Sequence, residues 1–318
     1  MTRAVIHHSV HGTHWLDAAA LRSAIADREP TAEPAVAHTR GESETLLADA
    51  EVLLTSYLEP ELLEATSSLR WIQALSAGVD TLDLDRLEER RILLTSAAGA
   101  HAQPIAEQVL GYMLVFERRL DRAIESRRRG VWERFEGGEL YGRTLGVVGL
   151  GSIGVRTAEL AAAVGMEVIG TKRDPDVEID AVDRIYASDE LEAVLVEADY
   201  LLVCCPLTAE TEGLIGRVEL GALPDDAVVI NVARGEVVDE PALIGALQQR
   251  AIRGAALDVF ATEPLPPDST LWELSNVILT PHNAGSSPRL PGRLADVFVE
   301  NHAAFLAGEH DRMRNRVL

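Results

Sequence analysis

The amino-acid sequence predicts an α/β fold with two domains, each built on a parallel β-sheet. Short apolar segments alternate with helical segments along the whole chain, and this alternation is typical of parallel βαβ units. A glycine-rich turn follows one of the apolar segments at residues 149–154, in the middle of the chain. The length of 318 residues suits about two domains with large cores.

The first hundred residues have the pattern of a small α/β domain. Pro60 marks the start of one helix, because proline suits the first helical turn. The apolar segments predict strands at residues 3–6, 51–55, 69–75 and 91–95. The segments between them predict helices at residues 16–28, 60–65 and 83–90.

The second half continues the same alternation after one long helix, which is expected from Pro104 to about Arg128. Three arginines at 127–129 lie in its last turn, and we favour a solvated helix end over a phosphate site there. Strands are expected at residues 145–148, 167–170, 200–204, 227–231, 255–259 and 276–280. Helices are expected at residues 155–164, 241–249 and 289–306.

The order of these segments predicts a discontinuous first domain. The domain with the glycine turn begins near residue 100, and the last helix is left over after residue 287. The simplest closure returns this helix to the first domain. We therefore expect one domain from residues 1–99 and 288–318, and a second, doubly wound domain from residues 100–287. Two crossings would form a hinge over a cleft, where a small ligand belongs.

The glycine turn matches the pattern G-x-G-x-x-G between a predicted strand and a predicted helix. In this context Gly149 permits the tight turn, Gly151 lets the backbone approach a pyrophosphate, and Gly154 allows the helix to pack closely on the strand. The N–H groups at the helix start would then face the phosphates. We interpret the turn as a dinucleotide site; the alternative is a tight turn without a ligand.

The end of the next strand distinguishes between two cofactors. NAD sites place an acidic residue there for the ribose 2′-OH, but this chain has Thr171, Lys172 and Arg173. Two cations and a hydroxyl suit a 2′-phosphate, so we expect NADP(H) to be preferred. Asp174 follows directly and could still reach a ribose, which leaves NAD(H) open.

Three polar residues follow later strands and suit acid–base chemistry. His282 is a general acid–base candidate, Glu263 could fix its tautomer, and Arg234 offers a two-pronged grip on a carboxylate. Because ligands of open α/β sheets lie outside the carboxyl ends of the strands, we expect these three residues to form a catalytic site.

The charge and composition exclude several classes of protein. With 29 basic and 51 acidic residues the net charge is −22, which repels nucleic acid and anionic membranes. Lys172 is the only lysine. The excess carboxylates repel one another, and salt would screen this repulsion, so we favour adaptation to a salt-rich cytosol. A GC-rich genome explains the lack of lysine but not the acidic excess.

No apolar run is long enough to span a membrane, and the first residues lack a signal-peptide core, so a cytoplasmic location is expected. The adjacent Cys204 and Cys205 are expected to be buried small hydrophobes.

The combination of motifs resembles the D-isomer-specific 2-hydroxyacid dehydrogenase family over nearly the whole chain. The matching segments are 76–80, 149–154, 205–208 with Thr211, 231–235, 258–265 and 281–285. The resemblance implies two Rossmann-like or flavodoxin-like domains and a dimer formed through the nucleotide domain. It also implies reversible hydride transfer between the nicotinamide and the C2 atom of a 2-ketoacid or D-2-hydroxyacid.

The resemblance also implies residue roles. Arg234 would bind the substrate carboxylate and carbonyl, while Glu263 supports His282, which exchanges the proton. Backbone N–H groups of Ala77, Gly78 and Val79 would bind the substrate carboxylate, and Asp258 would contact the nicotinamide carboxamide. The expected cofactor contacts are Gly149, Gly151, Ser152, Ile153, Gly154, Thr171, Lys172, Arg173, Cys205, Pro206, Thr211, Val232, Ala233, Arg234, Asp258, His282, Ala284 and Gly285.

Two other functions fit the same scaffold: formate or phosphite oxidation, and a non-catalytic nucleotide sensor or corepressor. The intact acid–base residues argue against the sensor. Tyr57 and Trp132 are candidates for the substrate pocket. Four N-terminal histidines, at positions 7, 8, 11 and 14, match no motif of the family. We expect them to be solvated or to lie at a strand edge, and no metal site is predicted; a metal site is the weaker alternative.

Overall fold

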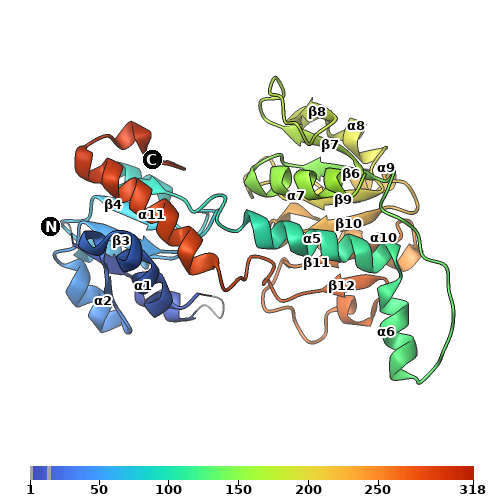
Figure 1. The fold of residues 1–318 in the computed structure, drawn as a ribbon, viewed down its shortest axis with the longest axis horizontal. Helices are drawn as coiled ribbons and strands as arrows, with labels where there is room; N and C mark the ends of the chain where they lie inside the picture. The colour runs from blue at the N-terminus through green and yellow to red at the C-terminus, as the bar shows by residue number, and fades with distance from the viewer. Residues whose placement is uncertain (1–2, 13–15) are drawn as a thin grey trace. The chain divides into compact units, whose positions relative to one another are not determined.

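The computed structural model describes residues 3–12 and 16–318, and the chain divides into two compact units (Figure 1). Unit 1 extends to His101 and resumes at Ser286–Leu318, while unit 2 is Ala102–Gly285. Both crossings lie two residues from the boundaries expected from the sequence. No helix in the described part of the chain is long and apolar enough to cross a membrane.

Unit 1 contains a five-stranded parallel sheet in the order β2-β1-β3-β4-β5. Its strands are β1 (Ala4–Ile6), β2 (Ala35–Val36), β3 (Val52–Thr55), β4 (Trp71–Ala74) and β5 (Leu93–Thr95). Its helices are α1 (Ala18–Arg28), α2 (Arg40–Leu47), α3 (Pro60–Ala65), α4 (Leu84–Glu89) and α11 (Leu290–Ala307). This strand order is the flavodoxin-like form of a doubly wound sheet.

The two faces of this sheet are covered by different helices. Trp71 packs on the face covered by α1 and α11, where its ring stacks on Phe298 with centroids 5.5 Å apart. Ile72, the next residue, packs on the face covered by α2, α3 and α4. Successive strand residues point to opposite faces, so apolar runs of this kind are buried on both sides. Figure 1 shows α11 lying beside α1, although the two are far apart in sequence.

Unit 2 contains a seven-stranded parallel sheet in the order β12-β11-β10-β9-β6-β7-β8. Its strands are β6 (Thr144–Val148), β7 (Glu167–Lys172), β8 (Arg184–Ala187), β9 (Tyr200–Val203), β10 (Val228–Asn231), β11 (Gly254–Leu257) and β12 (Val277–Leu279). Its helices are α5 (Ala102–Glu117), α6 (Leu120–Arg128), α7 (Ser152–Ala163), α8 (Leu191–Leu195), α9 (Arg217–Ala222) and α10 (Glu240–Gln249). The order is that of a Rossmann sheet with one added strand, which confirms the predicted fold class.

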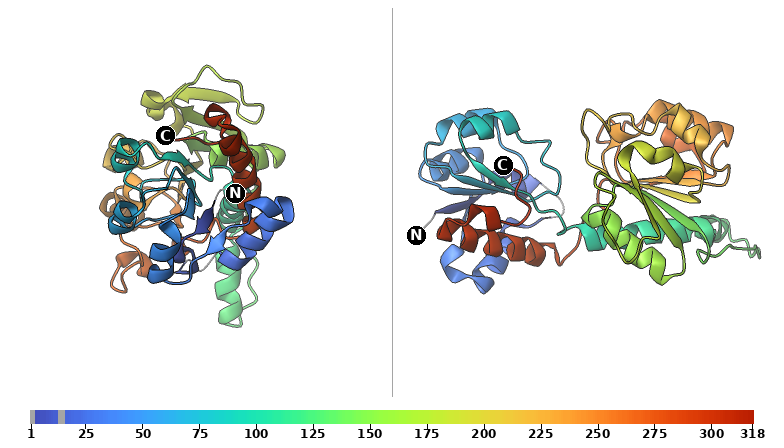
Figure 2. Two further views of the ribbon diagram at one scale, coloured as in Figure 1. Left: turned by 90° about the vertical axis from the view of Figure 1, so that its left-hand side faces the viewer. Right: turned by 90° about the horizontal axis from the view of Figure 1, so that it is seen from above.

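Alternate residues of β9 again divide the core. Tyr200 and Leu202 pack with α5 and α7, whereas Leu201 and Val203 pack with α8, α9 and α10. Figure 2 shows helices on both faces of this sheet. The order of the strands reverses between β6 and β9, and such a switch point is where ligands bind in doubly wound sheets.

The long helix predicted from Pro104 to Arg128 is wrong in its middle. The chain forms two helices, α5 and α6, separated at Arg119, whose φ of 50° is left-handed. The last carbonyl groups of α5 have partners outside the helix: Phe116 accepts a hydrogen bond from Arg253, and Glu117 accepts one from the N–H of Gly138 at 2.8 Å. These contacts end α5 before the helical pattern does.

Several elements were missed from the sequence. They are β2, α2, β8, α8 and α9. β2 has two residues, α2 is mostly polar, and every residue of β8 at the sheet edge is partly exposed, so none has a strong apolar period.

Candidate active site

The glycine turn joins β6 to α7 at the switch point of the seven-stranded sheet. Gly149 has a φ of 102°, and a Cβ atom there would lie 2.9 Å from the backbone of Cys205. A Cβ on Gly154 would collide with the carbonyl oxygen of Gly149. At Gly151, by contrast, nothing lies within 4 Å of a Cβ position. Two glycines are thus required by close packing, and the third keeps open space in front of the turn.

The start of α7 offers backbone donors to that open space. The helix begins at Ser152, and its N-cap residue Gly151 makes no side-chain cap. The first N–H groups of a helix have no partner within the helix, and the positive end of its dipole lies there. Ser152 and Ile153 therefore present the donors that a diphosphate needs.

The three residues at the end of β7 take different positions. Thr171 is buried, and its hydroxyl accepts a hydrogen bond from the N–H of Gly149 at 3.3 Å. Lys172 donates from Nζ to the carbonyl oxygen of Leu150 at 2.7 Å. Arg173 is exposed. Thr171 therefore supports the turn from inside, and the two cations stand beside it.

A cavity of about 330 Å³ lies beside the turn. Its lining residues include Gly149, Gly151, Thr171, Lys172, Arg173, Cys205, Pro206, Thr208 and Thr211. The segment after β9 closes on itself, because the Thr211 hydroxyl donates to the carbonyl oxygen of Pro206 at 2.6 Å. Burial raises the pKa of Cys205 to about 11, so its thiol stays protonated and unreactive where it lines the cavity.

His282 and Glu263 form a hydrogen-bonded pair outside the carboxyl ends of β11 and β12. Nδ1 of His282 lies 2.7 Å from Oε2 of Glu263. The other carboxylate oxygen accepts a hydrogen bond from the N–H of Phe260 at 3.1 Å. An ionised carboxylate only accepts hydrogen bonds, so Nδ1 carries a proton and Nε2 is left for proton exchange.

The contact between His282 and Glu263 shifts their two pKa values in opposite directions. The hydrogen bond that His282 donates to Glu263 raises the pKa of His282, although burial and the charge of Arg234 oppose the shift. Burial alone would raise the pKa of Glu263, but the hydrogen bond and charge of His282 hold it below its usual value. A larger fraction of this histidine is therefore protonated at neutral pH than of an isolated one, as a general acid requires.

Asp258 holds the turn that carries His282. Its buried carboxylate accepts hydrogen bonds from the Thr280 hydroxyl at 2.6 Å and from the N–H groups of Asn283 at 3.0 Å and Ala284 at 2.9 Å. Its backbone carbonyl accepts the N–H of His282 at 2.8 Å. These bonds hold His282 at a φ of 49°, which is uncommon for a residue other than glycine.

Arg234 follows β10 on the same edge of the sheet. Its Nη1 donates to the carbonyl oxygen of Ala233 at 2.9 Å, and Asn231 bonds the backbone on both sides of the turn. A Cβ on the next residue, Gly235, would collide with the backbone of Phe260. Glycine at 235 thus lets the Arg234 turn lie against the segment that carries Glu263. The pKa shifts of Glu263 and His282 both respond to the charge of Arg234.

The predicted substrate loop lies in unit 1, after β4. The Ser76 hydroxyl donates to the carbonyl oxygen of Gly78 at 2.7 Å, which fixes the loop. Within the described residues, the backbone N–H groups of Ala77, Gly78 and Val79 donate no hydrogen bond. Three successive N–H groups without a protein partner are available to accept an anion.

Comparison with known proteins assigns this arrangement to a family. Residues 110–284 match the family described as D-isomer specific 2-hydroxyacid dehydrogenase, NAD binding domain. The chain belongs to this dehydrogenase family. It is 36% identical to a glyoxylate reductase of Korarchaeum cryptofilum over 266 residues, which are 81% of this chain and 79% of that protein.

Two further relatives extend the comparison. The chain is 35% identical to D-3-phosphoglycerate dehydrogenase of Methanocaldococcus jannaschii over 284 residues, but these cover 87% of this chain and 54% of that longer protein. A crystal structure of a D-isomer specific 2-hydroxyacid dehydrogenase from Xanthobacter autotrophicus Py2, in complex with NADPH and MES, aligns with a TM-score of 0.86 at 30% identity, over 100% of this chain and 98% of that one.

Other residues singled out from the sequence lie elsewhere. Trp132 lies after α6 with 94% of its surface exposed, and Tyr57 is about half exposed after β3. Arg128 and Arg129 pair with Glu125 at the end of α6, as solvated ion pairs. His7 is fully buried directly after β1, so of the two expectations, solvated or at a strand edge, the solvated one is wrong for this histidine. His14 lies outside the described residues, and the side chain of His11 is not described either.

The positioning role of Asp258 is what sequence reasoning missed. Its place directly after a buried strand, twenty-odd residues before a histidine turn, was visible in the sequence, but a contact across parallel strands leaves no local pattern.

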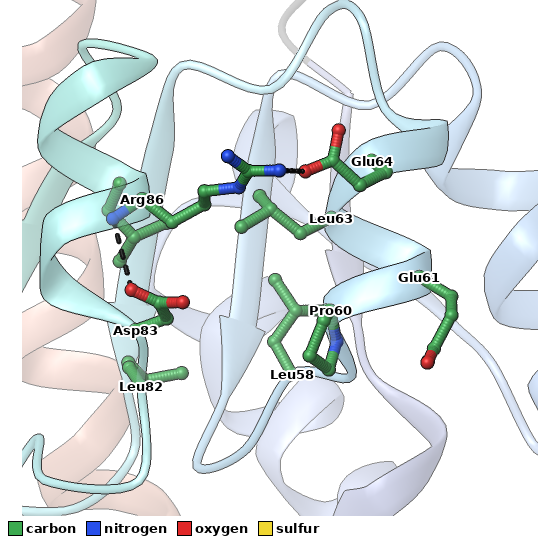
Figure 3. Close-up of a pocket in the computed structure, with 9 residues that line it drawn as sticks. Leu58, Pro60, Glu61, Leu63, Glu64, Leu82, Asp83 and Arg86 are labelled. Carbon is green, nitrogen blue, oxygen red and sulfur yellow. Dashed lines mark hydrogen bonds and ion pairs between the residues drawn. The ribbon is translucent and has the colours of Figure 1, made fainter.

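A smaller cavity of about 200 Å³ in unit 1, lined by Leu58, Pro60, Leu82 and Arg86 among others, contains no predicted site residue (Figure 3).

Proposed function

We propose that this protein reduces 2-ketocarboxylic acids to D-2-hydroxyacids with a nicotinamide cofactor, in a reversible reaction. The observation that carries the proposal is the 2.7 Å contact between His282 and Glu263, close enough to Arg234 for its charge to affect both. A proton donor and a carboxylate-binding cation on the edge of a dinucleotide-binding sheet are what ketoacid reduction requires.

Each side chain has one task in this proposal. Nε2 of His282 donates a proton to the carbonyl oxygen during reduction, and Glu263 favours the protonated ring beforehand. Arg234 binds the carboxylate and polarises the carbonyl group. The unpartnered N–H groups of Ala77, Gly78 and Val79 bind the substrate carboxylate. The cofactor supplies the hydride when it is bound.

The residues of the turn and cavity fit the cofactor, and we infer that they hold it. Gly151, Ser152 and Ile153 would bind the diphosphate, while Pro206 and Thr211, which also line the cavity, would contact the cofactor. The remaining contacts proposed lie after β10, after β11 and in the histidine turn, and they are Val232, Ala233, Arg234, Asp258, His282, Ala284 and Gly285. Asp258 is already bonded to three donors of its own turn, so we assign it mainly to positioning.

We infer a preference for NADP(H). The exposed Arg173 and the ammonium group of Lys172 lie beside the cavity where the ribose 2′-phosphate would be. The carboxylate of Asp174 accepts a hydrogen bond from the N–H of Asp176 at 3.3 Å and is not among the lining residues, which lessens the case for a ribose contact. NADPH is bound in the similar structure from Xanthobacter.

A homodimer through unit 2 is part of the proposal. Leu120, Ile124, Val131 and Trp132, on α6 and the segment after it, are large apolar side chains that remain exposed. Apolar side chains gathered on one projecting element are typical of an interface.

The test is a panel of 2-ketoacids of increasing size, beginning with glyoxylate because a relative of 36% identity is a glyoxylate reductase. NADPH absorbance is followed with each acid, and formate and phosphite are offered with NADP⁺. Oxidation of NADPH by a ketoacid supports the proposal. Tight NADPH binding with no turnover of any acid would support the sensor, and reduction of NADP⁺ by formate or phosphite would support that chemistry instead.

A further inference from the structure

The histidines that follow β1 have no role in the proposed reaction, yet two of them meet a carboxylate. His7 and His8 directly follow β1, and Glu59 follows β3 at the start of α3. β1 and β3 are neighbours in the sheet, and the order of the strands reverses between them. Doubly wound sheets bind ligands outside the carboxyl ends of their strands at such a switch point.

Each histidine lies as far from one oxygen of Glu59 as two ligands of one metal ion lie from each other. Nε2 of His7 lies 3.3 Å from Oε2 of Glu59, and Nε2 of His8 lies 3.4 Å from Oε1. The three ligand atoms all lie within 4.8 Å of one another. Two ligands bound about 2.0–2.1 Å from a tetrahedral ion are about 3.3–3.4 Å apart.

The hydrogen bonding leaves the same atoms unsatisfied. Nε2 of His7 and Oε2 of Glu59 are both buried, and neither makes a hydrogen bond to any described residue despite their short separation. Polar atoms are seldom buried without a partner, so this pair of buried atoms has room in its bonding for a cation between them.

The other ring nitrogens are held by hydroxyl groups. Nδ1 of His7 lies 2.8 Å from Oγ of Ser9, and Nδ1 of His8 lies 2.9 Å from Oγ of the fully buried Ser43. Histidines that bind metals commonly have the second ring nitrogen in a hydrogen bond, because that bond orients the ring. Both rings are thus held with Nε2 toward Glu59.

Glu59 is also held in place by its helix. It is the N-cap of α3, but its carboxylate makes no capping bond and is directed to the histidines instead. α3 is fixed at its other end by Arg90, which donates to the carbonyl groups of Leu63 and Thr66, and by the contact of Arg86 with Glu64 (Figure 3).

We propose that His7, His8 and Glu59 bind a divalent transition-metal ion, and that Zn²⁺ fits the site best. Two imidazoles and one carboxylate suit zinc, whereas Mg²⁺ and Ca²⁺ prefer oxygen ligands alone. Three protein ligands leave a fourth tetrahedral position for water or a small ligand. This site is separate from the proposed acid–base pair in unit 2.

The experiment uses the full chain without an affinity tag, after removal of metals with a chelator. Co²⁺ is titrated while its visible absorption is recorded, and Zn²⁺ then displaces it; molar KCl suppresses weak binding to the many surface carboxylates. We expect one ion per chain, with the intense absorption of a tetrahedral site. His8→Gln and Glu59→Gln should each weaken binding at least about tenfold.

Glu61→Gln is the matched control, because Glu61 is two residues further along the same helix, exposed, and paired only loosely with Arg40 at 3.6 Å. It should bind Co²⁺ as the unaltered chain does. X-ray absorption of the zinc-loaded, unaltered protein gives a result that does not depend on the folding of any variant, and should count two imidazole ligands. The proposal is overturned if no saturable binding occurs, if Glu59→Gln binds as well as Glu61→Gln, or if no imidazole contributes to the zinc spectrum.

Discussion

Lys172 donates a hydrogen bond from Nζ to the backbone carbonyl oxygen of Leu150 at 2.7 Å. The only lysine of the chain therefore braces the glycine turn from the end of the neighbouring strand. Leu150 is part of that turn, and its own N–H is bonded to the carbonyl oxygen of Thr171 at 2.9 Å. The ammonium group thus supports the shape of the turn in addition to the phosphate contact proposed for it.

The two cations beside the turn are predicted to respond differently to mutation. Arg173→Gln should weaken NADPH binding at least about tenfold and leave NADH binding nearly unchanged, because a hydrogen bond between charged groups contributes about 1.5–3 kcal/mol. Lys172→Gln should weaken the binding of both NADPH and NADH, because the glycine turn itself loses a hydrogen bond that supports it. Dissociation constants from fluorescence titration measure both effects. An equal loss of affinity for NADPH and NADH in Arg173→Gln would contradict the proposal that Arg173 binds the 2′-phosphate.

The pH dependence of reduction should follow from the pair of His282 and Glu263. Reduction needs protonated His282, and its pKa is raised, so the rate is full at low pH and falls as the pH rises through that value. Glu263→Gln removes the main cause of the shift. The falling limb of the kcat/KM profile should therefore move to lower pH.

Asp268→Asn is the control for this profile, since Asp268 is an exposed acid in the same proline-rich loop. It should leave the limb where it is. An unmoved limb in Glu263→Gln would show that another group sets the profile.

Glu117 is predicted to hold unit 2 together at the end of α5. Its carboxylate is almost fully buried and accepts hydrogen bonds from Tyr200 and from Arg253, the latter at 3.1 Å, with Arg143 at 3.5 Å. Glu117→Gln would leave two guanidinium groups without their shared anion, and should lower the free energy of unfolding by about 3 kcal/mol. Urea denaturation at neutral pH measures the change.

The same contacts determine how the contribution of Glu117 to stability changes with pH. Burial alone would raise the pKa of Glu117, but its hydrogen bonds and the two arginines hold it below the usual value. Its contribution to stability is thus present at neutral pH and is lost as the pH falls through that lowered pKa. Glu159→Gln, in an exposed pair with Arg156, should change stability by at most about 0.5 kcal/mol. A loss no larger for Glu117→Gln than for Glu159→Gln would refute the role given to this network.

The net charge of −22 should make stability depend on salt. The melting temperature should rise between low salt and about 1 M KCl, where screening acts within about 3 Å, because repulsion among carboxylates is removed. Sucrose at the same osmolality is the control, because it is excluded from the protein surface but cannot screen charges. A melting temperature that is unaffected by KCl would leave only the base composition of the genome to explain the missing lysines.

The fold followed closely from local patterns. Apolar runs such as 200–203 predicted buried parallel strands, and these form β9 at the centre of the larger sheet. The glycine turn likewise matched a local sequence pattern, although only one of its two tight contacts is local: Gly154 meets the carbonyl oxygen of Gly149 within the motif, whereas Gly149 meets the backbone of Cys205 after β9. Long apolar periods and glycine turns are local properties, which a sequence displays directly.

The parts that were missed depend on contacts between distant residues. The break between α5 and α6 is caused by Arg253 and Gly138, far from the helix in sequence. The carboxylate of Asp258 holds a turn that lies more than twenty residues away, and His7 meets Glu59 only because their strands are neighbours. Apolar periodicity contains no information about such partners.

The most direct test of the central claim compares the unaltered enzyme with His282→Ala, using NADPH and a 2-ketoacid whose product is chiral. The unaltered enzyme should consume NADPH and form hydroxyacid in equal amounts, and chiral chromatography should detect only the D-hydroxyacid. His282→Ala should bind NADPH with nearly the same affinity but turn over about a hundredfold more slowly or worse. Formation of the L-hydroxyacid, or equal turnover in His282→Ala, would contradict the account.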